Sequence, residues 1–329
     1  PLDGFETRTT GSRGVHDPLR AHALVMEDGA TRVGWVIADL SGVPAAVTCR
    51  VRELATARVG APADAIMVSA THTHGGPSPR PVTGVDADLA AHARWLDRLP
   101  GLLADALAAA ADGLAPASLG WGRAACTDVQ HNRRFHMKDG TVKMVWDTFD
   151  EHDVSWLGPV DPAVQVMTIH GGERLRGVLV QFACHPTVLV GDNLLITADW
   201  PGVMREELRT LWGAPELWVG VAQGCCGDIT PSPPRGTYPI CEEKGKAIAR
   251  HAARAVARAE PARGDAVAAA RVPVRLPRKR PGFDPAFTGD FYDAEVDALR
   301  AGELAAVGLP GEVLVDIGLE IKAHSEFRG

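Results

Sequence analysis

Short apolar runs alternate with longer amphipathic segments along the whole chain, and this alternation restricts the possible folds more than any other sequence feature. The short runs are typical of buried strands, and apolar residues spaced three or four apart indicate helices. Strands and helices interspersed in this way favour an α/β or α+β layered fold, with mixed sheets flanked by helices. No internal repeat or low-complexity run interrupts the 329 residues, and we expect a single layered domain.

The pattern predicts where most elements lie. Strands are expected at residues 31–39, 65–71, 118–127, 141–146, 164–170, 176–184, 217–222, 266–276 and 305–309. Helices are expected at residues 44–59, 88–111, 200–212, 241–259, 293–300 and 311–323. The segment from Pro277 to Asp290 is rich in proline and charge, and we expect a surface loop that is either a lid or a simple connection.

Charge and hydropathy argue against two classes of partner. The formal net charge of −7 and the pI near 6.0 leave no electrostatic footprint for nucleic acid or for anionic lipid surfaces. No stretch reaches the ~18–20 consecutive apolar residues of a membrane span. No signal peptide is visible in the sequence. We therefore expect a soluble protein, cytoplasmic or secreted, and the sequence leaves its oligomeric state open.

The six cysteines include no CxxC pair. A chain of this length with so few cysteines is not a disulfide scaffold, so buried free thiols are expected. Cys184 directly precedes His185, but neighbouring side chains on a strand point to opposite faces. A catalytic Cys–His pair between them is therefore disfavoured.

Two histidines, His72 and His74, follow the predicted strand at residues 65–71 in the sequence ATHTHGGP. Residues i and i+2 of extended backbone share a face, so the two imidazoles are expected to converge at the sheet edge. Neutral imidazole is a common zinc ligand. Two loop histidines with local hydrogen bonds are the alternative, but HxH at a strand end followed by glycines favours a metal site.

Three further turns after predicted strands carry polar side chains. His185 lies in FACHPT, Asp228 and Thr230 lie in QGCCGDITP, and Glu312 lies in GLPGE, where a helix is expected to start. Each has a structural alternative. For His185 it is a core or capping histidine. For Asp228 and Thr230 it is a tight turn with an Asx hydrogen bond. For Glu312 it is an acid favoured by the helix dipole.

Three charged residues are weaker candidates. Arg133, in HNRR, either presents its guanidinium to a carbonyl or carboxylate or is a solvated loop charge. Asp199, in TADWPG, precedes a predicted helix and either caps it or serves the site. Asp39 ends the first predicted strand and is a candidate partner for a metal ligand. Asp39, Asp199 and Asp228 are thus expected to support the ligands or contact the substrate.

Six motifs follow one another along the chain: ATHTHGGP, HNRR, FACHPT, TADWPG, QGCCGDITP and GLPGE. In this order they resemble the motifs of the neutral/alkaline (non-lysosomal) ceramidases, which are zinc amidases. The resemblance covers essentially the whole chain, and GVHDPLRAHALVMEDG near its start shares it. It implies a zinc cofactor held by His72, His185 and Glu312. It also implies that His74 and Arg133 contact the substrate or the zinc-bound water.

The resemblance further implies one ceramidase-like catalytic domain over residues 1–329, of a short bacterial type, and whether the chain is trimmed at its ends stays open. The implied activity is that of a zinc-dependent amidohydrolase, which cleaves a small-molecule N-acyl compound by metal-activated water. Thr230 would hydrogen-bond the substrate amide. Hydrolysis of an ester, lactone or cyclic amide at the same metal is one alternative. A catalytically inactive binding protein that keeps the fold is another.

The chain departs from the family pattern at two points. The family has a serine where Thr230 stands, and a tyrosine ligand downstream of the PGE motif. The two tyrosines of this chain, Tyr238 and Tyr292, both precede Glu312. Aromatic residues make up only 5% of the chain, and the loops after the motifs are polar. We therefore expect a short, polar substrate and not a long-chain ceramide.

Overall fold

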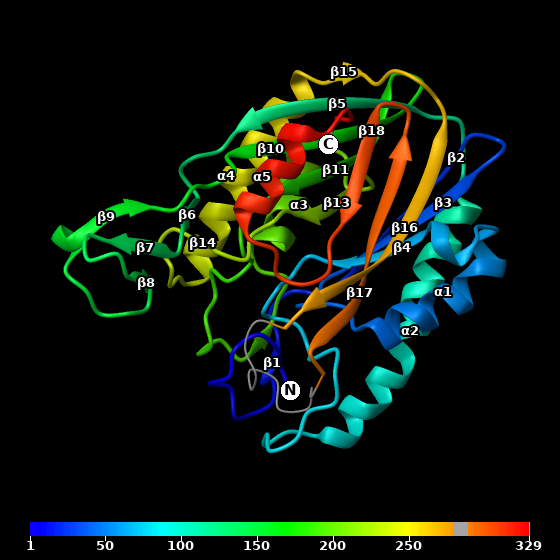
Figure 1. The fold of residues 1–329 in the computed structure, drawn as a ribbon. Helices are drawn as coiled ribbons and strands as arrows, with labels where there is room; N and C mark the ends of the chain where they lie inside the picture. Colours follow the sequence, from blue (N-terminus) through cyan, green and yellow to red (C-terminus); the bar gives the residue numbers. More distant parts are fainter. Residues whose placement is uncertain (279–288, 329) are drawn as a thin grey trace.

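Two sheets stacked face to face form the centre of the protein, and a pair of helices covers the outer face of each (Figure 1). This arrangement comes from a computed structural model that describes residues 1–278 and 289–328. Three apolar clusters separate the four layers, one between the sheets and one beneath each helix pair. The predicted α/β layered fold, with mixed sheets flanked by helices, is confirmed.

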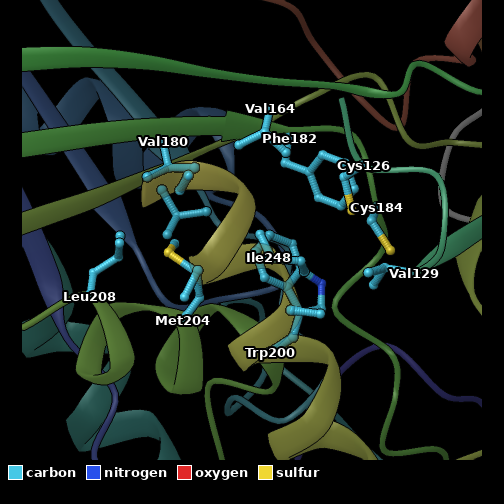
Figure 2. Close-up of a cluster of buried hydrophobic side chains, with 14 of the residues drawn as sticks. Cys126, Val129, Val164, Val180, Phe182, Cys184, Trp200, Met204, Leu208 and Ile248 are labelled. Atoms are coloured by element: carbon cyan, nitrogen blue, oxygen red, sulfur yellow. The ribbon is translucent and has the colours of Figure 1, made fainter. Parts of the chain in front are cut away.

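The larger sheet has five strands in the order β13-β11-β10-β5-β15. β11 and β13 are parallel and the other pairs are antiparallel. Helices α3 and α4 cover its outer face around the fully buried Phe182, Trp200 and Ile248 (Figure 2). The elements are β5 (Ser118–Ala125), β10 (Ala163–Gly171), β11 (Arg174–Phe182), α3 (Trp200–Leu211), β13 (Trp218–Gln223), α4 (Tyr238–Ala257) and β15 (Glu260–Pro261).

The smaller central sheet, β2-β3-β4, contains the first predicted strand. From Val33 to Ala38, β3 is apolar because it is buried on both faces. Val36 faces the helices α1 and α2, while Trp35 and Ile37 face the larger sheet. The elements are β2 (Ala21–Glu27), β3 (Arg32–Ala38), α1 (Ala45–Val59), η1 (Ala63–Ala65), β4 (Ile66–Ala70) and α2 (Leu89–Asp112).

The remaining elements form smaller units around this centre. An antiparallel sheet contains β16 (Val267–Pro277), β17 (Phe291–Ala301) and β18 (Leu304–Gly308), and α5 (Val315–His324) follows it. A projecting sheet contains β7 (Arg134–Met137), β8 (Val142–Met144), β9 (Val154–Leu157) and the turn η2 (Glu151–Asp153) (Figure 1). Two short pairs are β1 (Gly14–Val15) with β12 (Leu195–Ile196), and β6 (Gln130–Asn132) with β14 (Ile229–Pro231). None of the helices in the described residues is both long and apolar enough to cross a membrane.

The helix predicted at residues 293–300 is wrong, because this segment is the strand β17, paired with β16 along its whole length. Its acidic residues alternate, so that Glu295 and Asp297 point the same way and pair with Arg52. These ion pairs and the sheet register override the helix propensity of its alanine, glutamate and leucine residues. Of the expected loop from Pro277 to Asp290, residues 279–288 lie outside the described part of the chain.

A buried ion pair ties α3 to the end of β3. The guanidinium of Arg205 donates to both carboxylate oxygens of Asp39, at 2.9 and 2.6 Å, with side chains 2% and 0% exposed. Asp39 also accepts from the backbone N–H of Arg20 and from the Thr71 hydroxyl. Asp39 therefore supports the loop that begins at Thr71 and is not itself at the surface of a site.

Replacing Arg205 with methionine is expected to lower the free energy of unfolding by about 3–5 kcal/mol, because it leaves the Asp39 carboxylate buried and unpaired. Urea denaturation measures this loss. Arg50→Met is the control. It breaks an exposed pair with Glu53, whose partners are 58% and 62% exposed, and should cost less than ~1 kcal/mol. Equal losses in the two variants would contradict the assigned role of the buried pair.

Candidate metal centre

Three imidazoles from two separate loops converge on one point. His72 and His74 follow β4, and His185 follows β11. The Nε2 atom of His72 lies 3.0 Å from that of His185 and 3.2 Å from that of His74. The sequence thus identified these three histidines, and the fold brings them together although His72 and His185 are 113 residues apart.

Backbone carbonyls fix the proton on two of the rings. Nδ1 of His72 donates to the carbonyl of Ser41, and Nδ1 of His185 donates to those of Cys226 and Ile229, at 2.6 and 3.0 Å. A carbonyl can only accept, so each Nδ1 carries a hydrogen, and in the neutral form of each ring the lone pair of Nε2 points into the cluster. Metal-bound histidines are usually oriented in this way.

The two lone pairs face each other across 3.0 Å, an arrangement that a cation would stabilise. Burial lowers the pKa of His185, whose side chain is 1% exposed, and so disfavours a proton between the rings. Four ligands at about 2.0–2.1 Å around zinc stand roughly 3.3 Å apart in a tetrahedron. The donor atoms and their spacing therefore fit a zinc ion.

The carboxylate of Glu312 completes the cluster. Its oxygens lie 3.5 Å from Nε2 of His72 and 3.2 Å from Nε2 of His185. The pKa of Glu312 lies well below its usual range because the rings of His185 and His72, when they carry a proton on Nε2, hydrogen-bond its oxygens. A metal ion in place of those protons would keep the group ionised in the same way. Glu312 does not open a helix as predicted. It lies in the loop after β18, and α5 begins at Val315.

The first histidine loop does not have the extended backbone that the sequence suggested. β4 ends at Ala70, and His72 has a φ of 66°, in the left-handed region that few residues other than glycine adopt. A Cβ on Gly75 would lie 2.3 Å from the carbonyl oxygen of Thr197, so glycine allows the loop to pack there. The imidazoles converge because of this turn and not because of strand alternation.

A second glycine controls the approach of the Glu312 loop. The backbone N–H of Gly227 donates to the carbonyl of Val313 at 2.8 Å. A Cβ at Gly227 would lie 2.4 Å from the carbonyl oxygen of Glu312. The QGCCGD motif therefore serves as a surface against which the Glu312 loop packs.

His74 differs from the other two histidines. Its Nδ1 is buried without a hydrogen-bond partner among the described residues, and its ring packs edge-on against Phe5. A hydrogen on Nδ1 would lack an acceptor, so the tautomer with the hydrogen on Nε2 costs less. Burial, with the nearby His72 and His185, lowers the pKa of His74 to about 2 and keeps the ring neutral. His74 thus presents a donor to the cluster.

Arg133 lies beside Glu312. Its guanidinium donates to the carbonyl of Gly227 and lies 3.8 Å from a Glu312 oxygen. The ring of Trp146, which is 63% exposed, lies 5.6 Å from the guanidinium carbon. The sequence alone does not place Trp146 beside Arg133, because Trp146 follows no motif. Arg133 is a fixed positive charge next to the cluster and not a solvated loop charge.

Asp228 and Thr230 have different surroundings. Asp228 is buried, and its carboxylate accepts from the backbone N–H of Val315 at 2.9 Å and from the Asn132 side chain at 3.1 Å. It thereby links the start of α5 to the loop that carries Arg133. Thr230 is also buried, on β14, and pairs with His131 of β6.

Asp199 lies behind the His185 loop. It accepts from the backbone N–H groups of Val188, Leu189 and Trp200, and it caps α3 as the structural alternative predicted. Burial raises its pKa to about 6. Like Asp39, it holds a histidine loop in place and lies in the interior.

A cleft of about 2010 Å³ runs past the cluster, and His72, His74 and Glu312 lie in its wall. Apolar side chains of the strands line it further on, among them Trp35, Met67 and Val307. The expectation of a polar site rested on the low aromatic content and on the loops after the motifs. The apolar lining comes from β3, β4 and β18, which the sequence predicted as strands without showing that they border a cleft.

The chain is similar to known proteins in sequence and in fold. The family described as neutral/alkaline non-lysosomal ceramidase, N-terminal, matches residues 1–269. Neutral ceramidase from Pseudomonas aeruginosa has a similar structure, with a TM-score of 0.72 and 18% identity over 94% of this chain and 59% of that one. A ceramidase complexed with C2 is also similar, with a TM-score of 0.71 and 17% identity over 97% of this chain and 61% of that one. The chain thus spans less than two thirds of either solved structure. No curated protein sequence matches it significantly.

Gly227→Ala is expected to weaken zinc binding by about 10–100-fold, the range typical when a residue supporting a ligand is lost. The new methyl group would displace the Glu312 loop, although every side chain that offers a ligand atom is still present. Competition with a chelator of known affinity measures the change. Gly101→Ala, in α2 where a Cβ meets open space, should bind zinc as the unaltered protein does. Unchanged affinity in Gly227→Ala would show that the Glu312 loop does not contribute a ligand.

Proposed function

The chain belongs to the neutral/alkaline non-lysosomal ceramidase family, and from this premise we propose that it is a zinc-dependent hydrolase of N-acyl amides. The observation that carries the proposal is the convergence of bare imidazole nitrogens and an ionised carboxylate in the wall of a large cleft. We propose residues 1–329 as one catalytic domain, because segments from its whole length meet at this point.

In this proposal His72, His185 and Glu312 hold the zinc ion. His72 and His185 are fixed as lone-pair donors by backbone carbonyls, and Glu312 supplies a negative charge. When bound, zinc supplies Lewis acidity, which lowers the pKa of water to about 7 and polarises a carbonyl. The protein residues orient the substrate and stabilise the charge that develops on it.

His74 and Arg133 are the proposed contacts for the acyl oxygen. The Nε2 hydrogen of His74 points into the cluster, and burial keeps this ring a neutral donor. The guanidinium of Arg133 is held against the Gly227 carbonyl, so it does not have to reorganise during the reaction. Two such fixed donors stabilise negative charge on the acyl oxygen.

The substrate is proposed to be an amide with a sizeable apolar acyl group. The cleft is larger than the roughly 300–1,000 Å³ typical of pockets for small ligands. Its apolar strand wall begins beside the histidines, so an acyl chain bound there would place its carbonyl at the cluster. This proposal replaces the short, polar substrate expected from composition.

The function is tested by assaying metal-free and zinc-reloaded protein on matched amides and esters. The panel contains a long-chain ceramide in detergent, short polar N-acyl compounds, and an ester and a lactone with the same acyl groups. We expect zinc-dependent amide cleavage that favours apolar acyl groups and is abolished in His185→Ala. His152→Ala, an exposed histidine on η2, should remain active. Absence of zinc from both the protein as purified and the zinc-reloaded protein, or cleavage of the esters alone, would overturn the proposal.

Thr230→Ala is expected to retain measurable turnover with a raised KM. A hydroxyl nucleophile needs an adjacent base, and Thr230 is proposed instead to hydrogen-bond the substrate amide. Steady-state kinetics separate the two effects, and Thr230→Ser should restore the KM. An acyl group found on Thr230 by mass spectrometry after rapid quenching would refute this role.

A further inference from the structure

A second group of metal-ligand side chains lies away from the histidine cluster. Cys126 and Asp128 occupy the turn after β5, and His251 faces them from α4. The Sγ of Cys126 lies 3.5 Å from an Asp128 oxygen, and Nε2 of His251 lies 3.4 Å from the same oxygen. One ligand atom from each residue lies within 4.8 Å of the others. From this geometry we propose a second site for a divalent transition metal such as zinc, held by Cys126, Asp128 and His251.

The spacing suits tetrahedral coordination. Ligands at about 2.3 Å for sulfur and 2.0–2.2 Å for nitrogen and oxygen stand roughly 3.3–3.6 Å apart around zinc. The separations of Asp128 from Cys126 and from His251 fall in that range, and the Cys126 and His251 atoms lie within 4.8 Å of each other. Thiolate, carboxylate and imidazole are all zinc ligands, and the thiolate also selects against magnesium and calcium, which prefer oxygen.

The surroundings allow a metal to enter from one side. Cys126 is fully buried at the edge of the apolar cluster under α4, near Phe182 (Figure 2). The side chain of Asp128 is 66% exposed, whereas that of His251 is 14% exposed. The cation would enter past Asp128, and water would complete its coordination.

Two features of the metal-free protein oppose binding and lower the affinity expected of this site. Burial raises the pKa of the Cys126 thiol to about 12, so the metal must displace its proton. The Nδ1 of His251 is buried without a partner among the described residues, so a hydrogen placed there on binding stays unsatisfied. Lys244, on the same helix, partly offsets the first cost because its charge favours the thiolate.

A metal here would fasten the turn after β5 to α4. It would therefore have a structural role, and it shares no residue with the histidine cluster. The chain would then bind two metal ions, and the ion at this site would be the one with a sulfur ligand. This difference separates it from the histidine cluster by spectroscopy.

The test is titration of the metal-free full chain with Co²⁺, followed by absorbance. We expect two equivalents to bind and a thiolate-to-cobalt charge-transfer band to appear with one of them. Cys126→Ser should lose the band and one equivalent. His251→Gln, which leaves the buried thiol in place, should bind this equivalent at least tenfold more weakly. His72→Ala should lose the other equivalent and keep the band, and Cys49→Ser, at an exposed cysteine on α1, should change neither.

Each contrary result has one meaning. A chain that binds Co²⁺ without a charge-transfer band, or keeps the band in Cys126→Ser, has no metal at this site. Loss of the band in Cys226→Ser alone would assign the sulfur ligand to the histidine cluster and overturn the proposal. A single equivalent with a band that depends on Cys126 would support this site and contradict the proposed function instead.

Discussion

Two imidazole nitrogens that face each other without a hydrogen between them are the constraint on which the site depends. In the neutral forms of His72 and His185 the one ring N–H is donated to a backbone carbonyl, so both Nε2 lone pairs point at the space between the two nitrogens, which lie 3.0 Å apart. Such an arrangement is unfavourable unless positive charge occupies it. The left-handed backbone of His72 adds a local cost that the surrounding packing must offset. A site that keeps both features has the strain and pre-organisation of a binding centre.

Buried acids behind the histidine loops maintain this arrangement. Asp39 holds Thr71, next to His72, and is itself held by Arg205. Asp199 holds the backbone that follows His185, and Asp228 joins the start of α5 to the Arg133 loop. Each carboxylate accepts several hydrogen bonds in the interior, where an unpaired charge would be costly. The layered core fixes the acids, the acids fix the loops, and the loops fix the imidazoles.

The sequence predicted the layers, and it singled out the three histidines and the glutamate that the fold brings together, because apolar periodicity and motifs at strand ends are local signals. It predicted residues 293–300 wrongly, since the ion pairs of Glu295 and Asp297 with Arg52 form only across the folded chain. It could not predict the carbonyl of Ser41 as the partner of His72, because any residue type offers a carbonyl. The sequence also could not decide whether Asp39 and Asp199 support the ligands or contact the substrate. An acid before a turn has the same local sequence whether it faces a ligand or the interior. Cys126 was expected only as a buried thiol, and Asp128 and His251 carry no motif.

The long separation of the cluster residues along the chain has a consequence for how the protein is made. His72 and His185 are 113 residues apart, and Glu312 follows β16, β17 and β18 in the chain. While the ribosome is still adding those strands, the nascent chain can offer the two histidines but not the carboxylate. Contacts of such high sequence separation form late and slowly. The cluster is therefore complete only after the last strands of the chain have been made and folded.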